Sequence, residues 1–150
     1  MKTRIITLLI LLTTVVSAGA QDLIDMIKRD INAERRTIIA EAMNIPLESE
    51  TEFWQMYNEM EQEMDLLADK RAINIKKFAD NYDNVTDDVA DALAKTSFDI
   101  ASGRVKINKN YYKKASKIIS KKEAARFIQL LNQIQLLIDI QIAAEVPLIE

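Results

Sequence analysis

Residues 49–84 decide the fold, and they read SETEFWQMYNEMEQEMDLLADKRAINIKKFADNYDN. Large apolar side chains recur in this stretch in steps of three and four, which places them on one face of an α-helix. That face consists of Phe53, Tyr57, Met60, Met64, Leu67, Arg71, Ile75, Phe78 and Tyr82, and only Arg71 interrupts its apolar character. The spacing predicts a helix of about thirty residues, about 45 Å long at 1.5 Å per residue.

Capping and turn residues mark where this helix begins and where the next one follows. Ser49-Glu50-Thr51-Glu52 has the pattern of a capping box, and Asn81-Tyr82-Asp83-Asn84 is a strong turn signal. Thr86, followed by two aspartates, predicts the start of a further helix that runs to about Ile118. Its core face is expected to consist of Val89, Leu93, Thr96, Ile100, Gly103, Ile107 and Tyr111. Gly103 indicates either a close helix crossing or a hinge.

Two more helices are predicted outside this pair. Residues 22–43 carry apolar side chains at helical spacing and are followed by Asn44-Ile45-Pro46, which ends a helix. Ser120-Lys121-Lys122-Glu123 is a second capping box, from which a helix should run to about Ala144. Its apolar side chains cover more than half of its circumference, so we expect it to be central or to lie in an interface. They are Phe127, Leu131, Ile134 and Ile138, with Leu130, Leu137 and Ile140 beside them.

The composition supports an all-α class and argues against catalysis. The 150 residues include 2 Gly, 2 Pro, no Cys and no His, with 49% apolar and 29% charged residues. These absences exclude disulfides, thiol nucleophiles, the usual zinc sites and histidine acid–base chemistry. The sequence does not gather a nucleophile, a base and an orienting group in one place, so we expect neither an enzyme nor a bound cofactor.

The first twenty residues have the pattern of a secretory signal peptide. Met1-Lys2-Thr3-Arg4 is basic, residues 5–16 are uncharged and mostly apolar, and Ala18-Gly19-Ala20 fits the small-residue cleavage site. The sequence therefore predicts cleavage after Ala20, export to the periplasm, and a single all-helical domain over residues 21–150. The apolar run is shorter than the roughly 20 residues that span a bilayer, which disfavours a retained anchor.

Charge is segregated along the chain and predicts how the long helices meet. Glu48 to Asp69 contains eight acids and no basic residue, whereas Arg104 to Arg126 contains nine basic residues and one acid. An antiparallel hairpin that folds back about Asp83 would bring the two runs together, with residue i facing about residue 166 minus i. Exposed ion pairs contribute only about 0–1 kcal/mol each, so their main effect would be on register.

The basic run is the main candidate for a binding surface. Nucleic acid is not expected as a partner, because the predicted export argues against it and residues 21–150 carry 18 basic and 23 acidic side chains, a net charge of −5. Two interpretations remain: internal pairing with the acidic run, or binding of acidic client segments or anionic lipid, with peripheral membrane contact. The candidate residues are Arg104, Lys106, Lys109, Tyr111, Tyr112, Lys113, Lys117, Leu130 and Leu137.

Met56, Met60 and Met64 form a weaker candidate site. Three thioethers at a spacing of four residues suit Cu(I), although methionine is also an ordinary core residue. Two of the three fall on the predicted apolar face, which favours the core interpretation. The acidic run forms no loop that could wrap a Ca²⁺ ion.

The chain resembles the Spy/CpxP group of exported helical-hairpin proteins. The resemblance covers about Ile24 to Ile149 in size, export and helix layout, with residues 45–49 (IPLES) and 118–122 (IISKK) in the places of that group's two helix-start motifs. Further features are similar to those of an uncharacterised set of exported helical proteins. These are Phe53-Trp54 with Tyr57, Asn81-Tyr82-Asp83 with Thr86, Tyr111-Tyr112-Lys113-Lys114, and Ala125-Arg126-Phe127 with Gln129.

The Spy/CpxP resemblance implies an ATP-independent periplasmic chaperone or envelope-stress adaptor. It also implies a homodimer with a concave, apolar and basic surface that binds unfolded or envelope proteins loosely. Metal-sensing members of the group use His ligands, which this chain lacks. The alternatives are a regulatory adaptor of an envelope sensor and a copper-handling protein that acts through the three methionines.

Overall fold

The computed structural model describes residues 33–149, and the chain divides into two units, Met1–Ile38 and Ile39–Glu150, which are treated separately. Within the first unit, the described residues 33–38 are helical. The predicted signal peptide over residues 1–20 and the first part of the predicted helix over residues 22–43 lie outside the described residues.

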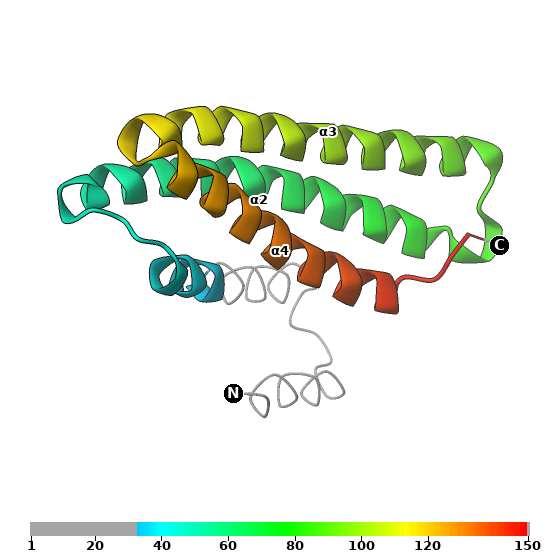
Figure 1. The fold of residues 1–150 in the computed structure, drawn as a ribbon. Helices are drawn as coiled ribbons and strands as arrows, with labels where there is room; N and C mark the ends of the chain where they lie inside the picture. Colours follow the sequence, from blue (N-terminus) through cyan, green and yellow to red (C-terminus); the bar gives the residue numbers. More distant parts are fainter. Residues whose placement is uncertain (1–32, 150) are drawn as a thin grey trace, which may run out of the picture. The chain divides into compact units, whose positions relative to one another are not determined.

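The second unit is built from helices. Residues 39–42 are helical and are followed by a short 3₁₀ turn, η2 (Leu47–Ser49), and the long helix α2 (Glu50–Asp80). A second 3₁₀ turn, η3 (Tyr82–Asn84), leads into α3 (Asp87–Ile118), and α4 (Lys121–Glu145) completes the order (Figure 1). Residues 33–149 contain four helices and no strand, which confirms the predicted all-α class.

Two of the predicted helix starts are present as expected. The Thr86 side chain accepts a hydrogen bond from the Val89 backbone N–H at 3.4 Å, and the Ser120 side chain accepts one from Glu123 N–H at 3.2 Å. Both residues have extended backbone angles, as an N-cap requires. The side-chain cap and the apolar spacing together explain why α3 and α4 begin where they do.

The predicted capping box at Ser49 is wrong. Ser49 already has helical backbone angles, because η2 precedes α2 without a break, and its side chain caps nothing. The hydroxyl instead donates a hydrogen bond of 3.0 Å to the carbonyl oxygen of Ile118. A carbonyl at the end of α3, where the last turn of a helix lacks internal partners, is satisfied in this way.

Helices α2 and α3 lie side by side over most of their length (Figure 1). Near the start of α2, Glu59 pairs with Lys114, and near its end Asn74 donates a hydrogen bond of 3.2 Å to Ser97. The predicted register, in which residue i faces about residue 166 minus i, is close near the connection and fails toward the start of α2. Asn74 bonds to the carbonyl oxygen of Leu93 where residue 92 was expected, whereas Glu59 pairs with Lys114 where residue 107 was expected.

Gly103 allows α2 and α3 to approach closely. A Cβ atom added at this position would lie 3.0 Å from Leu67 Cδ2, which is closer than ordinary van der Waals contact. The close crossing predicted as one explanation of this glycine is therefore present. Any larger side chain at residue 103 must displace Leu67.

The core is concentrated at one end of the second unit, where α2 begins, α3 ends and α4 begins. Phe53 packs edge-on against Phe127, with ring centroids 5.3 Å apart, and Tyr57 lies 6.3 Å from the same ring. The cluster consists of Ile39, Met43, Phe53, Met56, Tyr57, Met60, Ile107, Tyr111, Ala115, Ile119, Ala124, Phe127 and Leu131. Toward the other end, only Phe78 and Leu93 are buried among the described residues.

Candidate functional site

Three charged side chains meet between the helices at the thinly packed end. Arg71 on α2 donates a hydrogen bond of 2.5 Å to Asp139 Oδ1, and Arg104 on α3 donates one of 3.2 Å to Asp139 Oδ2. Gln135, one turn earlier on α4, donates to Oδ1 at 2.9 Å. Each of the three charged side chains is about one-third exposed. The cluster ties all three long helices together and carries two positive charges against one negative charge.

The surroundings of Asp139 favour its charged form. Burial alone would raise the pKa of this carboxyl, but hydrogen bonds from Arg71 and Gln135 and the positive charges of Arg71 and Arg104 outweigh that effect. The pKa of Asp139 therefore lies below its ordinary value of 3.8.

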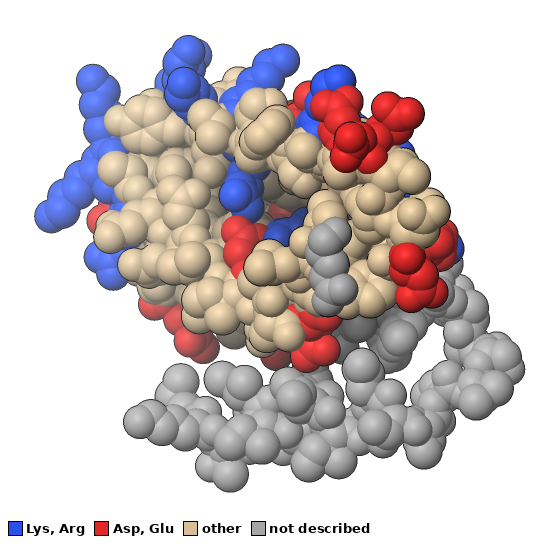
Figure 2. Space-filling model, turned by 90° about the vertical axis from the view of Figure 1, so that its right-hand side faces the viewer, with Lys and Arg blue, Asp and Glu red and all other residues tan. Residues whose placement is uncertain are grey.

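A cavity of about 720 Å³ opens beside this cluster. Figure 2 views this end of the molecule and shows a hollow with acidic and basic atoms at its base, framed by uncharged residues. Most of the walls are apolar, and residues 146–149 contribute to them. The lining residues are Arg71, Asn74, Ile75, Phe78, Leu93, Ser97, Ile100, Ala101, Arg104, Asp139, Ile142, Ala143, Val146, Pro147, Leu148 and Ile149.

The sequence carries a signal for this cluster in two isolated charges on apolar helix faces. Arg71 interrupts an otherwise apolar helix face, and Asp139 is the only charged residue between Arg126 and Glu145 on the most apolar helix. Opposite charges at isolated positions on two apolar faces are expected to pair, because an unpaired charge there would be costly. Arg104 was predicted as a binding residue and is at the cluster.

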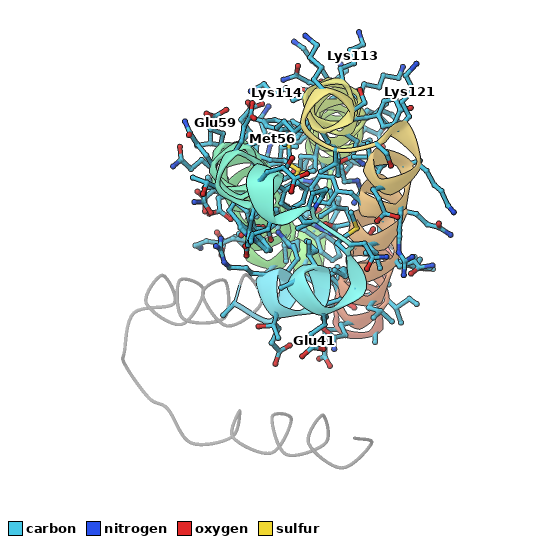
Figure 3. All side chains as sticks on the ribbon, turned by 60° about the vertical axis from the view of Figure 1, so that its left-hand side comes forward. Glu41, Met56, Glu59, Lys113, Lys114 and Lys121 are labelled. Carbon is cyan, nitrogen blue, oxygen red and sulfur yellow. The ribbon has the colours of Figure 1, made fainter. Side chains whose placement is uncertain are left out.

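A second polar network joins the acidic run of α2 to the basic run of α3. Tyr111, 1% exposed, donates a hydrogen bond of 2.7 Å from its hydroxyl to Glu63. Lys114 Nζ lies 3.0 Å from Glu59 Oε2 and 4.4 Å from the centre of the Tyr111 ring. In Figure 3, the labelled Glu59 and Lys114 lie next to each other, whereas Lys113 and Lys121 point outward. Part of the basic run is thus used for internal pairing.

These contacts shift the pKa values of two groups. Burial raises the pKa of Tyr111 above 10.0, and the hydrogen bond and negative charge of Glu63 raise it further, against an opposing effect of Lys114. The hydrogen bond to Glu59 raises the pKa of Lys114 above 10.5 despite the effect of burial. Both shifts favour the protonated forms that donate these hydrogen bonds.

The predicted binding residues do not form one surface. Tyr111 is buried in the core and Leu130 packs partly against it, so neither is freely accessible. Arg104 lies at the cavity. The remaining candidates are exposed: Lys106, Lys109, Tyr112, Lys113, Lys117 and Leu137.

The three candidate thioethers lie in or beside the core. Met56 and Met60 are 4% and 0% exposed, and Met64 packs against the same cluster. These positions agree with the core interpretation of the spacing. Within residues 33–149, no group of three or more His, Cys, Asp or Glu side chains could hold a metal ion.

The outer face of α4 is apolar and exposed. Leu136, Leu137 and Ile140 are 58%, 64% and 56% exposed, whereas the opposite face buries Phe127 and Leu131. Among the described helices, α4 alone is long and apolar enough to cross a membrane by length and composition, although the core helix of a soluble protein can pass the same test. Because α4 contacts α3 and supplies Asp139 to the cluster, it is part of the helical body.

Comparisons with protein-family models, curated proteins and solved structures found no match to this chain. Function must therefore be inferred from the side chains. The described residues offer two surfaces suited to noncovalent binding, namely the outer face of α4 and the cavity beside Arg71, Arg104 and Asp139.

Proposed function

We propose that this protein is an exported, non-enzymatic chaperone that binds apolar segments of unfolded or envelope proteins without ATP. The observation that carries the proposal is the outer face of α4, with Leu136, Leu137 and Ile140 each more than half exposed. A single exposed apolar residue is ordinary on a protein surface. Three within five positions of one helix form a patch, and such patches mark interaction sites.

The same face becomes basic toward the start of α4. Arg126 lies eleven residues before Leu137, about three helical turns, and Lys122 lies one turn earlier still, so all three project from one side. Basic residues in the first turn are unfavourable with respect to the helix dipole, so helix stability does not account for Lys121 and Lys122. A client segment with apolar residues followed by acidic ones would complement this face.

The proposed frame for this surface is an antiparallel hairpin of α2 and α3. Its support is the order of the contacts, in which Glu59 pairs with Lys114 near one end and Lys70 lies 3.9 Å from Asp99 further along. We further propose a homodimer, in which a second copy extends the apolar and basic surface. The support for the dimer is the apolar area that α4 leaves exposed, together with the resemblance to Spy/CpxP proteins. Export to the periplasm is supported by the composition of residues 1–20.

Suppression of client aggregation by matched variants tests the proposal. Light scattering of an unfolded client protein would be followed with the wild-type protein, with Leu137→Gln and with Leu66→Gln. Leu66 on α2 is 70% exposed, so its substitution makes the same chemical change away from the proposed surface. Burial of a leucine side chain contributes about 1.5–3 kcal/mol, so Leu137→Gln should require at least about tenfold more protein for equal suppression.

Leu66→Gln should behave like the wild-type protein. Failure of the wild-type protein to suppress aggregation at equimolar concentration would contradict the chaperone proposal. Equal losses in both leucine variants would show that the outer face of α4 is not the binding surface. Light scattering of the protein alone, over a range of concentrations, would test the dimer by its mass.

A further inference from the structure

We propose that the cavity between α2, α3 and α4 is a binding site for the anion of a long-chain fatty acid. The carboxylate would lie beside Arg71 and Arg104, and the hydrocarbon chain would lie among the apolar walls. This site is separate from the outer face of α4 and does not depend on the proposed chaperone activity.

The charge at the base of the cavity favours an anion. Two guanidinium groups face one carboxylate, that of Asp139, so the cluster has a net charge of +1. A guanidinium has five N–H donors, and in the described part of the chain Arg71 and Arg104 each use only Nη1. The remaining donors suit a second carboxylate, because arginine binds carboxylates through paired N–H groups.

The walls favour a hydrocarbon chain. Ile75 and Phe78 from α2, Ile100 from α3 and Ile142 from α4 line the cavity, and the terminal residues Val146 to Ile149 extend its apolar surface. Leu148 is 87% exposed, so a chain lying against it would remove apolar surface from water. The volume of about 720 Å³ lies within the range of about 300–1,000 Å³ that is typical of small-molecule sites.

The position of the core explains why this space is open. The large aromatic side chains gather at the opposite end of α2, and near the cavity only Phe78 and Leu93 are buried among the described residues. An apolar cavity with a net positive charge at its base matches an amphiphile with one anionic group. A cationic amphiphile would meet two guanidinium groups, which disfavours it.

The first experiment uses the wild-type protein, expressed from the full chain, and measures binding by isothermal titration calorimetry. The probes are laurate, octanoate and dodecyltrimethylammonium, each below the concentration at which it forms micelles. Laurate should bind at least about tenfold more tightly than octanoate, since each added CH₂ group in the cavity contributes up to about fourfold in affinity. Laurate should also bind at least about tenfold more tightly than the cationic probe.

Variants then test the location. Arg104→Gln and Ala143→Phe should each weaken laurate binding by at least about tenfold, the first by removing a charge and the second by filling the cavity. Lys106→Gln and Ala144→Phe are matched controls, because both residues are exposed, neither lines the cavity, and each lies on the same helix as its counterpart. Both controls should bind laurate like the wild-type protein. Circular dichroism would confirm that each variant is folded.

Several results would overturn the proposal. These are no measurable laurate binding, equal binding of the cationic probe, or equal losses in the variants and their controls. Tighter binding of an apolar peptide with a free C-terminal carboxylate would assign the cavity to protein segments instead. If Arg104→Gln does not fold, the comparison of the three probes and the Ala143→Phe variant still decide whether the cavity binds the fatty-acid anion. Ala143→Phe should retain suppression of client aggregation, so failure of this site and failure of the chaperone proposal are distinguishable.

Discussion

Replacement of Asp139 by alanine should lower the free energy of unfolding by about 2 kcal/mol. The carboxylate accepts hydrogen bonds from Arg71, Arg104 and Gln135, so the substitution leaves two neighbouring guanidinium groups without their shared acceptor. Hydrogen bonds to charged groups contribute about 1.5–3 kcal/mol each when buried. Because about a third of each charged side chain is exposed, we expect the three hydrogen bonds together to contribute an amount near the lower end of this range to the free energy of unfolding.

Urea unfolding, followed by far-ultraviolet circular dichroism, measures this loss. Asp99→Ala is the matched control, since Asp99 lies 3.9 Å from Lys70 and both side chains are more than half exposed. The control should lose no more than about 0.5 kcal/mol. Fluorescence of Trp54, which lies at the core end, would show whether the two ends unfold together. Equal losses for Asp139→Ala and Asp99→Ala would refute the assigned role of the cluster.

The pH dependence of the same measurement provides a second test. The pKa of Asp139 is below its ordinary value of 3.8 in the folded protein, because favourable hydrogen bonds and charges outweigh burial. The contribution of this group is therefore present above the unfolded-state pKa and is lost as the pH falls through the folded-state pKa. The difference between the wild-type protein and Asp139→Ala should be constant from neutral pH to about pH 5 and shrink below about pH 4. A difference that persists unchanged in strong acid would refute the electrostatic explanation.

Two further substitutions probe the contact between α2 and α3. In urea unfolding, Gly103→Ala should change the free energy of unfolding by less than about 1 kcal/mol, because the gain in helix propensity is offset by displacement of the flexible end of Leu67. Gly103→Val should be clearly destabilising, because its larger side chain must displace Leu67 further. Tyr111→Phe should lower the free energy of unfolding by about 1 kcal/mol, because it removes the hydrogen bond to Glu63. It should also remove the part of the ultraviolet titration of tyrosine that occurs at the highest pH, since burial and Glu63 raise the pKa of Tyr111. A tyrosine titration that Tyr111→Phe leaves unchanged at its high-pH end would contradict this assignment.

The helices could be predicted because each depends on local signals. Thr86 and Ser120 supply caps from their own side chains, and the apolar spacing of α2 and α3 extends over many turns. The predicted ends at Asp80 and Ile118 agree with the structure. Local hydrogen bonding and helical periodicity depend on short stretches of sequence, so the starts and ends of these helices can be predicted without knowledge of the fold.

The errors concern features that depend on distant residues. A capping box would have the Ser49 oxygen accept a hydrogen bond from the backbone N–H three residues later. The hydroxyl instead donates to the carbonyl oxygen of Ile118, because packing brings the end of α3 beside it. The register of α2 against α3 depends on packing along both helices, so the expected partner of Asn74 is nearly correct, whereas the expected partner of Glu59 lies seven residues before Lys114. The cluster of Arg71, Arg104 and Asp139 draws on three helices at once, so no single stretch of sequence reveals it.

The second half of α4 departs in part from the pattern expected for a surface helix, because apolar residues lie on both of its sides and Asp139 lies on the inner side. This departure links its stability to its proposed function. An amphipathic helix normally turns charged residues to solvent and apolar ones inward. Here Asp139 faces Arg71 and Arg104, while Leu137 and Ile140 face outward. Apolar residues in place of a partly buried ion pair are often equally stable, so stability alone does not explain the cluster. Its distinctive effect is to fix which side of α4 turns outward, and the side that it exposes is the one suited to binding a partner.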